Sequence, residues 1–152
     1  MSQWISPEEW HTIVENVPIV SVDLLVVYEG KLVFGKRQNE PAKDYWFVPG
    51  GRVYKGETRE EAAHRIAEQE LGLEIEIVES LGAYEHFYDT ADVAGVDSKH
   101  YLANGYVVTC LSGELEADDQ HESLRLFNSP PTPLHEYIKQ FLTDATSLPE
   151  WP

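Results

Sequence analysis

Apolar and polar positions follow two periodicities along this chain, one typical of strands and one typical of helices. Residues 19–37 contain two β-branched runs around Glu29 and Gly30, a pattern that predicts a β-hairpin. Residues 45–51 predict a short strand that runs into a glycine turn. Further strand patterns cover residues 73–88, 100–113 and 123–127.

Three segments predict helices instead. Ser6 can cap a helix that ends near Asn16, with a proline and a glutamate at the positions typical of a helix start. Residues 58–71 predict a continuous helix that ends at Gly72, a natural C-cap. Residues 133–148 predict an amphipathic helix. The buried stripe expected on the central helix consists of Ala62, Ala63, Ile66 and Ala67. Together these elements predict a mixed α/β fold.

Composition narrows the class of protein. The chain has 152 residues, 42% of them hydrophobic, which suits a single domain over residues 1–152 with a core of its own. No apolar run is long enough to span a membrane, and the N-terminus lacks the pattern of a secretory signal. The single cysteine, Cys110, cannot form an intrachain disulfide. We therefore expect a cytoplasmic protein with no membrane partner.

The net charge of −16 limits the partners further. With 11 basic against 27 acidic residues, a nucleic-acid-binding surface is not expected, because phosphate backbones require Lys and Arg. An anionic substrate would need a divalent cation or a few placed arginines to neutralise it. The acidity has an alternative explanation, adaptation to a high-salt cytoplasm, in which screening relieves self-repulsion.

One spacing carries specific chemistry. Gly51 is followed after five residues by Glu57 and after seven more by Arg65, and Glu70 and Gly72 complete the run. This spacing resembles the Nudix box. The resemblance implies the Nudix fold, an α/β/α sandwich around a mixed β-sheet with the box as a loop-helix-loop. It also implies Mg²⁺-dependent hydrolysis of nucleoside diphosphates linked to another group, and a structural pairing of Glu57 with Arg65.

The box departs from its family pattern at two positions, Ile66 and Gln69, where glutamates are expected. On an α-helix, positions 66 and 70 lie about 40° apart, so two glutamates there could hold one metal cluster. Glu70 with other oxygen ligands could still hold a single Mg²⁺. The alternative is a degenerate box that is retained only for folding.

Segments outside the box resemble GDP-mannose mannosyl hydrolases, an atypical branch of this family. The resemblance extends to about residue 127 and is weak in the C-terminal helix. It implies attack of water at the anomeric carbon of GDP-mannose or GDP-glucose, release of GDP and the free sugar with inversion, one Mg²⁺ that Mn²⁺ can replace, and a homodimer. The matching segments are residues 34–37, 45–53, 85–89, 99–101 and 118–122.

The same resemblance assigns a metal site and a base. Gly50 would offer its carbonyl oxygen to Mg²⁺, Glu70 its carboxylate and Gln120 a neutral oxygen. His121 would take a proton from the attacking water, a role that suits an imidazole whose pKa lies near neutrality. Taken alone, His121 could equally be a surface histidine on an acidic loop.

Substrate contacts are implied for five further residues. Arg37, Arg52 and Tyr101 match residues that contact the diphosphate, and Asp23 and His86 match residues that face the sugar. Arg37, Tyr101 and Asp23 are expected to take part in catalysis as well as in binding. Two alternatives remain, that Asp23 faces outward from a half-exposed strand and that His86 is an ordinary strand histidine.

Two rival functions remain at this stage. One keeps the fold but cuts between the phosphates of a nucleotide, and it does not need His121. The other is a binding module that senses nucleotide sugars without turnover. The loop at residues 89–99 is expected to touch the substrate, and Trp4 and Trp10 could serve an interface between subunits.

Overall fold

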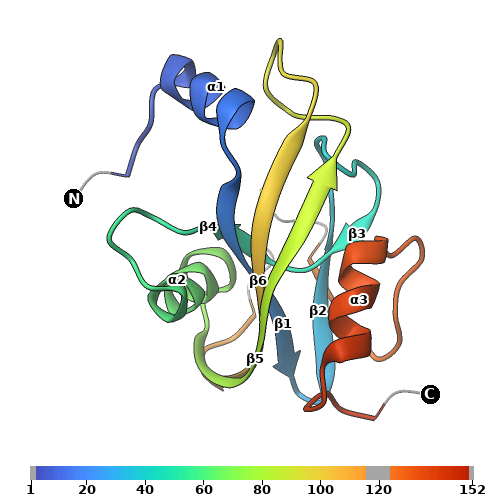
Figure 1. The fold of residues 1–152 in the computed structure, drawn as a ribbon. Coiled ribbons are helices and arrows are strands. Elements are labelled where there is room, and N and C mark those ends of the chain that lie inside the picture. Colours follow the sequence, from blue (N-terminus) through green and yellow to red (C-terminus); the bar gives the residue numbers. More distant parts are fainter. Residues whose placement is uncertain (1–2, 116–123, 151–152) are drawn as a thin grey trace.

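A computed structural model describes residues 3–115 and 124–150, which form a mixed β-sheet with helices on both faces (Figure 1). None of the helices in these two ranges is long and apolar enough to cross a membrane. In chain order the elements are α1 (Pro7–Asn16), β1 (Ile19–Tyr28), β2 (Lys31–Lys36), β3 (Trp46–Phe47), β4 (Gly50–Arg52), α2 (Arg59–Ile66), the π-helical turn η1 (Ala67–Leu71), β5 (Glu74–Tyr88), β6 (Lys99–Ser112), β7 (Arg125–Phe127) and α3 (Glu136–Asp144).

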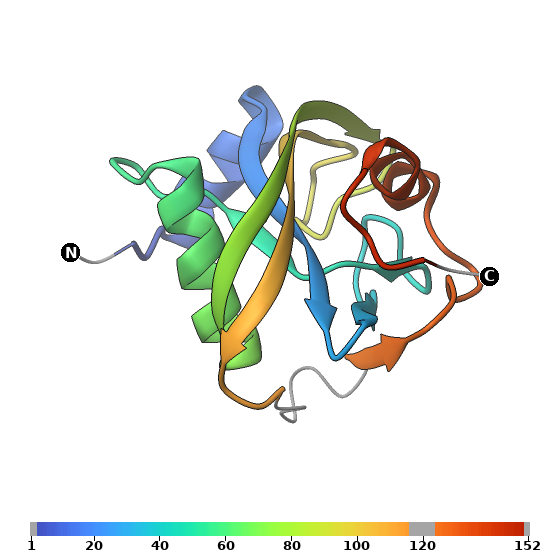
Figure 2. The same cartoon turned by 90° about the horizontal axis from the view of Figure 1, so that it is seen from below.

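The sheet has the strand order β3-β2-β1-β6-β5, with β4 paired to β1 and β7 paired to β2. Strands β1 and β6 run parallel, whereas the other pairs are antiparallel. Seen from below, the sheet lies between α2 on one side and α3 on the other (Figure 2). The α/β/α sandwich around a mixed sheet is therefore confirmed.

The predicted hairpin is present as β1 and β2. Val27 pairs with Leu32 and Tyr28 with Lys31, which leaves Glu29 and Gly30 as the turn. Both turn residues have positive φ, 52° and 76°, as a two-residue turn between twisted strands requires.

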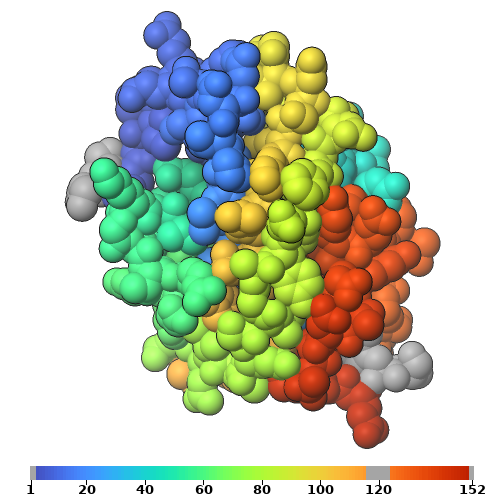
Figure 3. Space-filling view, viewed as in Figure 1, coloured from blue at the N-terminus to red at the C-terminus, as the bar shows by residue number. Residues whose placement is uncertain are grey.

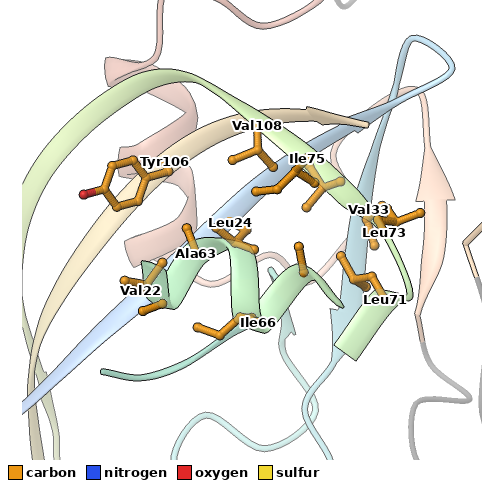
Figure 4. Close-up of a cluster of buried hydrophobic side chains, with 13 residues drawn as sticks. Val22, Leu24, Val33, Ala63, Ile66, Leu71, Leu73, Ile75, Tyr106 and Val108 are labelled. Atoms are coloured by element: carbon orange, nitrogen blue, oxygen red, sulfur yellow. The ribbon is translucent and has the colours of Figure 1, made fainter. Parts of the chain in front are cut away.

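Two apolar clusters hold the layers together. Under α2, Ile66 and Leu71 pack with Val22, Leu24 and Tyr106 from β1 and β6 (Figure 4). On the opposite face, the second cluster joins α3 to β1, β2 and β6 through Ile138, Phe141, Leu25, Phe34 and Val107. Full burial of each such side chain stabilises the folded state by about 1.5–3 kcal/mol, relative to leaving it exposed to water. Both faces of β1 are thus buried, which explains its nearly continuous apolar sequence.

The prediction of one continuous α-helix over residues 58–71 is wrong in its last turn. The α-helix ends at Ile66, and residues 67–71 form a π-helical turn in which the Gly72 N–H reaches back to the Ala67 oxygen. Gly72 has φ 69°, as expected of a C-cap glycine. The 40° separation expected between positions 66 and 70 therefore does not apply, and Ile66 lies in the core, where it reaches Gly51.

Residues 45–51 also differ from the prediction. They contain two short strands, and the glycines belong to the second, β4, rather than to a turn. Gly50 pairs with Asp23 on β1. A side chain at position 50 would place its Cβ 2.7 Å from the Val22 carbonyl oxygen, so only glycine fits there. This pairing brings the box against the central strand.

Candidate active site

A cavity of about 250 Å³ opens beside β1, between β4, the start of β6 and the end of β5. Its walls come from segments that are far apart in the sequence, including α1 and the loop that follows β2. Many of the site residues predicted from the sequence line it together, namely Asp23, Arg37, Gly50, Arg52, His86 and Tyr101.

A second cavity of about 260 Å³ adjoins the first and contains Glu70. Four residues line both cavities, namely Arg37, Phe47, Val48 and Gly50, so Glu70 lies across this shared wall from the first cavity. The remaining two predicted residues, Gln120 and His121, lie outside the described residues.

The donors in the second cavity suit one hard cation. Glu70 carries a carboxylate on the π-helical turn, and Gly50, which has a backbone carbonyl to offer, lines the same cavity. Within residues 3–115 and 124–150, no group of three His, Cys, Asp or Glu side chains is arranged to hold a metal. Mg²⁺ is commonly held by one or two carboxylates and keeps several waters, so this donor set fits a single ion.

Asp23 faces the first cavity, which resolves the alternative of an outward-facing aspartate. Its half-buried side chain lines the cavity from β1, and burial raises its pKa to about 7, although the positive charge of Arg37 acts in the opposite direction. A carboxyl group with a strongly shifted pKa in a cleft is a candidate for function.

This pKa shift predicts that Asp23→Asn stabilises the protein at alkaline pH. The pKa of Asp23 is higher in the folded than in the unfolded state, so its contribution to stability is lost as pH rises from about 4 towards 7. An uncharged isostere avoids this loss and should raise the free energy of unfolding by on the order of 2 kcal/mol at pH 8, with little change at pH 4. Urea unfolding at both pH values measures the difference.

Asp97→Asn is the matched control, because Asp97 is exposed on the loop between β5 and β6. We expect Asp97→Asn to show no comparable increase in the free energy of unfolding at pH 8. A loss of stability for Asp23→Asn at pH 8 would contradict the assignment of a costly buried charge.

His86 also lines the cavity, from near the end of β5. The side chain is 3% exposed, and burial, with a smaller contribution from His135, lowers its pKa to about 4. The imidazole is therefore neutral at pH 7. A neutral imidazole has one donor and one acceptor nitrogen, which suits hydrogen bonding to a hydroxyl group.

Arg52 lines the cavity, and its guanidinium lies close to two aromatic rings. Its guanidinium donates a hydrogen bond of 2.7 Å to the Gln3 carbonyl and lies 4.6 Å from the ring centroid of Tyr54 and 5.7 Å from that of Trp10. Trp10 itself lines the cavity from α1, a role that the sequence did not reveal. Nothing local to Trp10 marks it, because the two cations that lie over its ring, Arg52 and Lys99, are more than 40 residues away.

Lys99 is a second residue that the sequence analysis missed. It is 7% exposed, and its Nζ donates a 2.9 Å hydrogen bond to Asp92 and lies 5.4 Å from the ring centroid of Tyr101. Burial disfavours the charge, but Tyr101 and Asp92 outweigh it and raise the pKa of Lys99. The loop between β5 and β6 is thereby tied to Tyr101 in the cavity wall.

The box is held by Arg65 and Glu57, the pairing that the resemblance to the Nudix box implies. Arg65 Nε donates to Glu57 at 2.7 Å, and its terminal nitrogen donates to the Arg52 carbonyl at 2.8 Å. Its guanidinium also lies 3.6 Å from the Tyr54 ring centroid. Gln69 accepts a 3.3 Å hydrogen bond from Arg65, so this residue extends the network of the box.

Comparison with known proteins agrees with this geometry. The family model of the NUDIX domain matches residues 17–145. The low-salt glycan biosynthesis protein Agl8 of Haloferax volcanii is 51% identical over 138 residues, which cover 91% of this chain and 88% of that protein. The ADP-ribose pyrophosphatase of Methanocaldococcus jannaschii is 32% identical over 73% of this chain and 62% of that protein.

Solved structures share the same architecture. The crystal structure of a MutT NUDIX hydrolase from Burkholderia pseudomallei superposes with a TM-score of 0.69 at 30% identity, and covers 85% of this chain and 98% of that one. A NUDIX hydrolase from Nitrosomonas europaea superposes with a TM-score of 0.60 at 20% identity, covering 89% and 76% of the two chains. The box spacing, the sandwich and these matches lead to one conclusion: the chain belongs to the Nudix hydrolase family.

Proposed function

We propose that this protein hydrolyses a nucleoside-diphosphate sugar, GDP-mannose or GDP-glucose, by attack of water at the anomeric carbon. The water oxygen forms a bond to C1, and the bond between C1 and the diphosphate oxygen breaks. The electron pair of that bond leaves with GDP, and the sugar is released with inverted configuration. His121 takes the proton from the attacking water.

The other site residues serve the two halves of the substrate. Arg37 and Arg52 bind the diphosphate and stabilise the charge that grows on it, together with the Tyr101 hydroxyl. Asp23 and His86 bind hydroxyls of the sugar. A bound Mg²⁺, held by Gly50, Glu70 and Gln120, would supply further neutralisation of the diphosphate.

One observation carries the proposal: the residues assigned to phosphate and to sugar line a single cavity, and Glu70 lies in the cavity beside it. The two positions where the box lacks acids support it as well. Ile66 belongs to the core and Gln69 bonds to Arg65, so neither side chain is placed as a ligand of a second ion. Attack at carbon needs a good leaving group and a placed water rather than several metals.

Relatives favour two different reactions. The name of the Haloferax volcanii relative refers to glycan biosynthesis, which fits a sugar-bearing substrate. The Methanocaldococcus jannaschii relative is named as an ADP-ribose pyrophosphatase, which favours cleavage between phosphates as the second candidate. The proposal includes a cytoplasmic homodimer, to which the exposed Trp4 would contribute.

The position of the cut bond decides between these reactions. We expect that hydrolysis of GDP-mannose with Mg²⁺ in ¹⁸O-labelled water places the label in mannose, as read by mass spectrometry. His121→Ala should lower kcat by about 100- to 10,000-fold, the range for loss of a general base. A panel of other nucleotide sugars under the same conditions defines the base and the sugar.

Each alternative has its own signature. Label in GDP would contradict attack at carbon, and release of a nucleoside monophosphate would indicate the diphosphatase. Binding of nucleotide sugars with no product at excess Mg²⁺ would indicate a binding module. Full activity of His121→Ala would remove the assigned base without changing the cut bond.

A further inference from the structure

The C-terminal helix α3 packs against the outer side of β5, the last strand in the sheet order, and their surfaces meet along the face seen in Figure 3. Tyr84 of β5 contacts Phe141 and Asp144 of α3, and Tyr137 makes a further contact nearer the end of the strand. The Tyr137 hydroxyl accepts a hydrogen bond of 3.0 Å from the Phe87 N–H and donates one of 2.8 Å to the Phe87 carbonyl. One side chain thus satisfies both backbone groups of a residue at the sheet edge.

The ring of Tyr137 lies on the ring of His86. Their centroids are 4.2 Å apart and their planes differ by 1°, which is a parallel stack. Phe141 packs against the same imidazole at 5.5 Å, and Tyr88 approaches it edge-on at 6.4 Å. Two of these three rings, those of Tyr137 and Phe141, belong to α3, and only the Tyr137 ring lies parallel to the imidazole.

The Nε2 atom of His86 is buried and has no hydrogen-bond partner among the described residues. A buried polar atom without a partner costs about 1–3 kcal/mol, so a partner is to be expected when the site is in use. His86 lines the cavity, and its Nε2 atom is closed off from solvent in this structure, so a ligand hydroxyl reaches this atom only if the surrounding side chains shift on binding. Tyr137 cannot supply this partner, because its hydroxyl is already bonded to Phe87.

We propose that Tyr137 is a positioning residue, which holds the His86 imidazole so that Nε2 meets a hydroxyl of the sugar half of the substrate. This inference rests on the proposed function, because it requires a hydroxyl-bearing group in the cavity. It assigns a role in the site to the C-terminal helix, through a residue that is not among those lining either of the two cavities.

Two substitutions of Tyr137 separate the contribution of its ring from that of its hydroxyl. Tyr137→Leu removes the stack and should lower kcat/KM for GDP-mannose by about 100-fold, the effect of a misplaced group in a site. Tyr137→Phe keeps the stack and should recover most of that activity. In a His86→Ala background, Tyr137→Leu should cause little further loss, because the two residues act as a unit.

Binding and spectroscopy distinguish positioning from a general structural role. With Mg²⁺ removed, Tyr137→Leu should weaken binding of GDP-mannose in calorimetry but leave binding of GDP unchanged, since GDP has no sugar beyond the diphosphate. Equal weakening for both ligands, or an undiminished loss in the His86→Ala background, would overturn the proposal. The nuclear magnetic resonance signals of the His86 ring should shift in Tyr137→Leu and stay close to wild type in Tyr137→Phe.

The same set of measurements keeps the two proposals apart. If the wild-type protein cleaves no nucleotide sugar, the proposed function fails, and the His86 ring signals still decide whether Tyr137 orders the imidazole. Ring signals that are identical in the wild type and in Tyr137→Leu would overturn the positioning role whatever the activity.

Discussion

Replacing Arg37 with glutamine is expected to lower kcat/KM for the nucleotide sugar by about 100- to 1,000-fold, the cost of removing one preorganised donor at a site of developing charge. Arg37 follows β2 directly and lines both cavities. Its Nε donates a 3.1 Å hydrogen bond to the Pro41 carbonyl, and its guanidinium lies 5.8 Å from the Phe47 ring centroid. This anchoring holds the guanidinium before a ligand binds, so we expect little further loss of order when it binds a diphosphate.

Arg125→Gln is the matched control. It makes the same change in charge at an exposed position on β7 that lines neither cavity, and we expect it to keep wild-type activity. Arg37→Lys should recover only part of the rate, because an ammonium cannot reproduce the two parallel hydrogen bonds of a guanidinium. Equal losses in Arg37→Gln and Arg125→Gln would show that overall charge, rather than a placed donor, is what matters.

Replacing Arg37 should also shift the pH dependence of kcat/KM. Its positive charge opposes the effect of burial on Asp23, so its removal lets the pKa of Asp23 rise above about 7. If ionised Asp23 is needed for catalysis, the acidic limb of the kcat/KM profile should move to higher pH in Arg37→Gln. Arg125→Gln should leave this limb in place.

Local signals predicted the secondary structure well because their causes are local. Ser6 and Thr58 each precede a helix and accept a hydrogen bond from the backbone N–H three residues on, at 3.2 and 3.0 Å. The turn at Gly30 and the C-cap at Gly72 need the positive φ that glycine adopts without strain. Each of these features depends on a few consecutive residues, so a single sequence contains the information.

The box spacing carried one part of the site prediction, and the resemblance of segments outside the box carried the other. The box spacing identified Glu57, Arg65 and Glu70, but the orientation of Asp23 and His86 stayed ambiguous, because a strand residue can face either way and the sequence does not say which side has a cavity. The structure brings both side chains into one cavity wall. Which way each faces is a property of the whole sheet.

Contacts across long sequence separations gave no signal at all. Tyr137 stacks on His86 from about 50 residues away, and Trp10 meets Arg52 from about 40 residues away. The π-helical turn at residues 67–71 was missed for a related reason, since its composition is that of an ordinary α-helix. Tertiary packing decides such features, and propensity does not.

Replacing Arg65 with methionine is expected to destabilise the protein by about 2–4 kcal/mol, because it leaves Glu57 part-buried without its partner. The two side chains are 19% and 14% exposed, and Arg65 meets both carboxylate oxygens, at 2.7 and 3.0 Å. Lys55→Met removes the same charge from an exposed position of the same loop, and we expect little change in its denaturant midpoint. A similar loss in both variants would contradict a specific role for the pair.

The pH dependence of this loss tests the same pair. The hydrogen bond from Arg65 is the main cause that lowers the pKa of Glu57 below its ordinary value of 4.5. The stabilisation is therefore present above that pH and is lost as pH falls through the folded-state pKa, so the wild type and Arg65→Met should converge in stability in acid. Glu57→Gln with Arg65→Met should be less destabilised than the sum of the two single changes, since no unpaired charge remains.

Loss of Arg65 should also lower the activity, because Arg65 is connected to the cavity through Arg52. Its terminal nitrogen holds the Arg52 carbonyl at 2.8 Å, and the Arg52 side chain lines the cavity. Arg65→Met should therefore lower kcat/KM even under conditions in which the variant is fully folded, whereas Lys55→Met should not. An Arg65→Met protein that is unstable but fully active when folded would limit the box arginine to a role in folding and remove its link to the cavity.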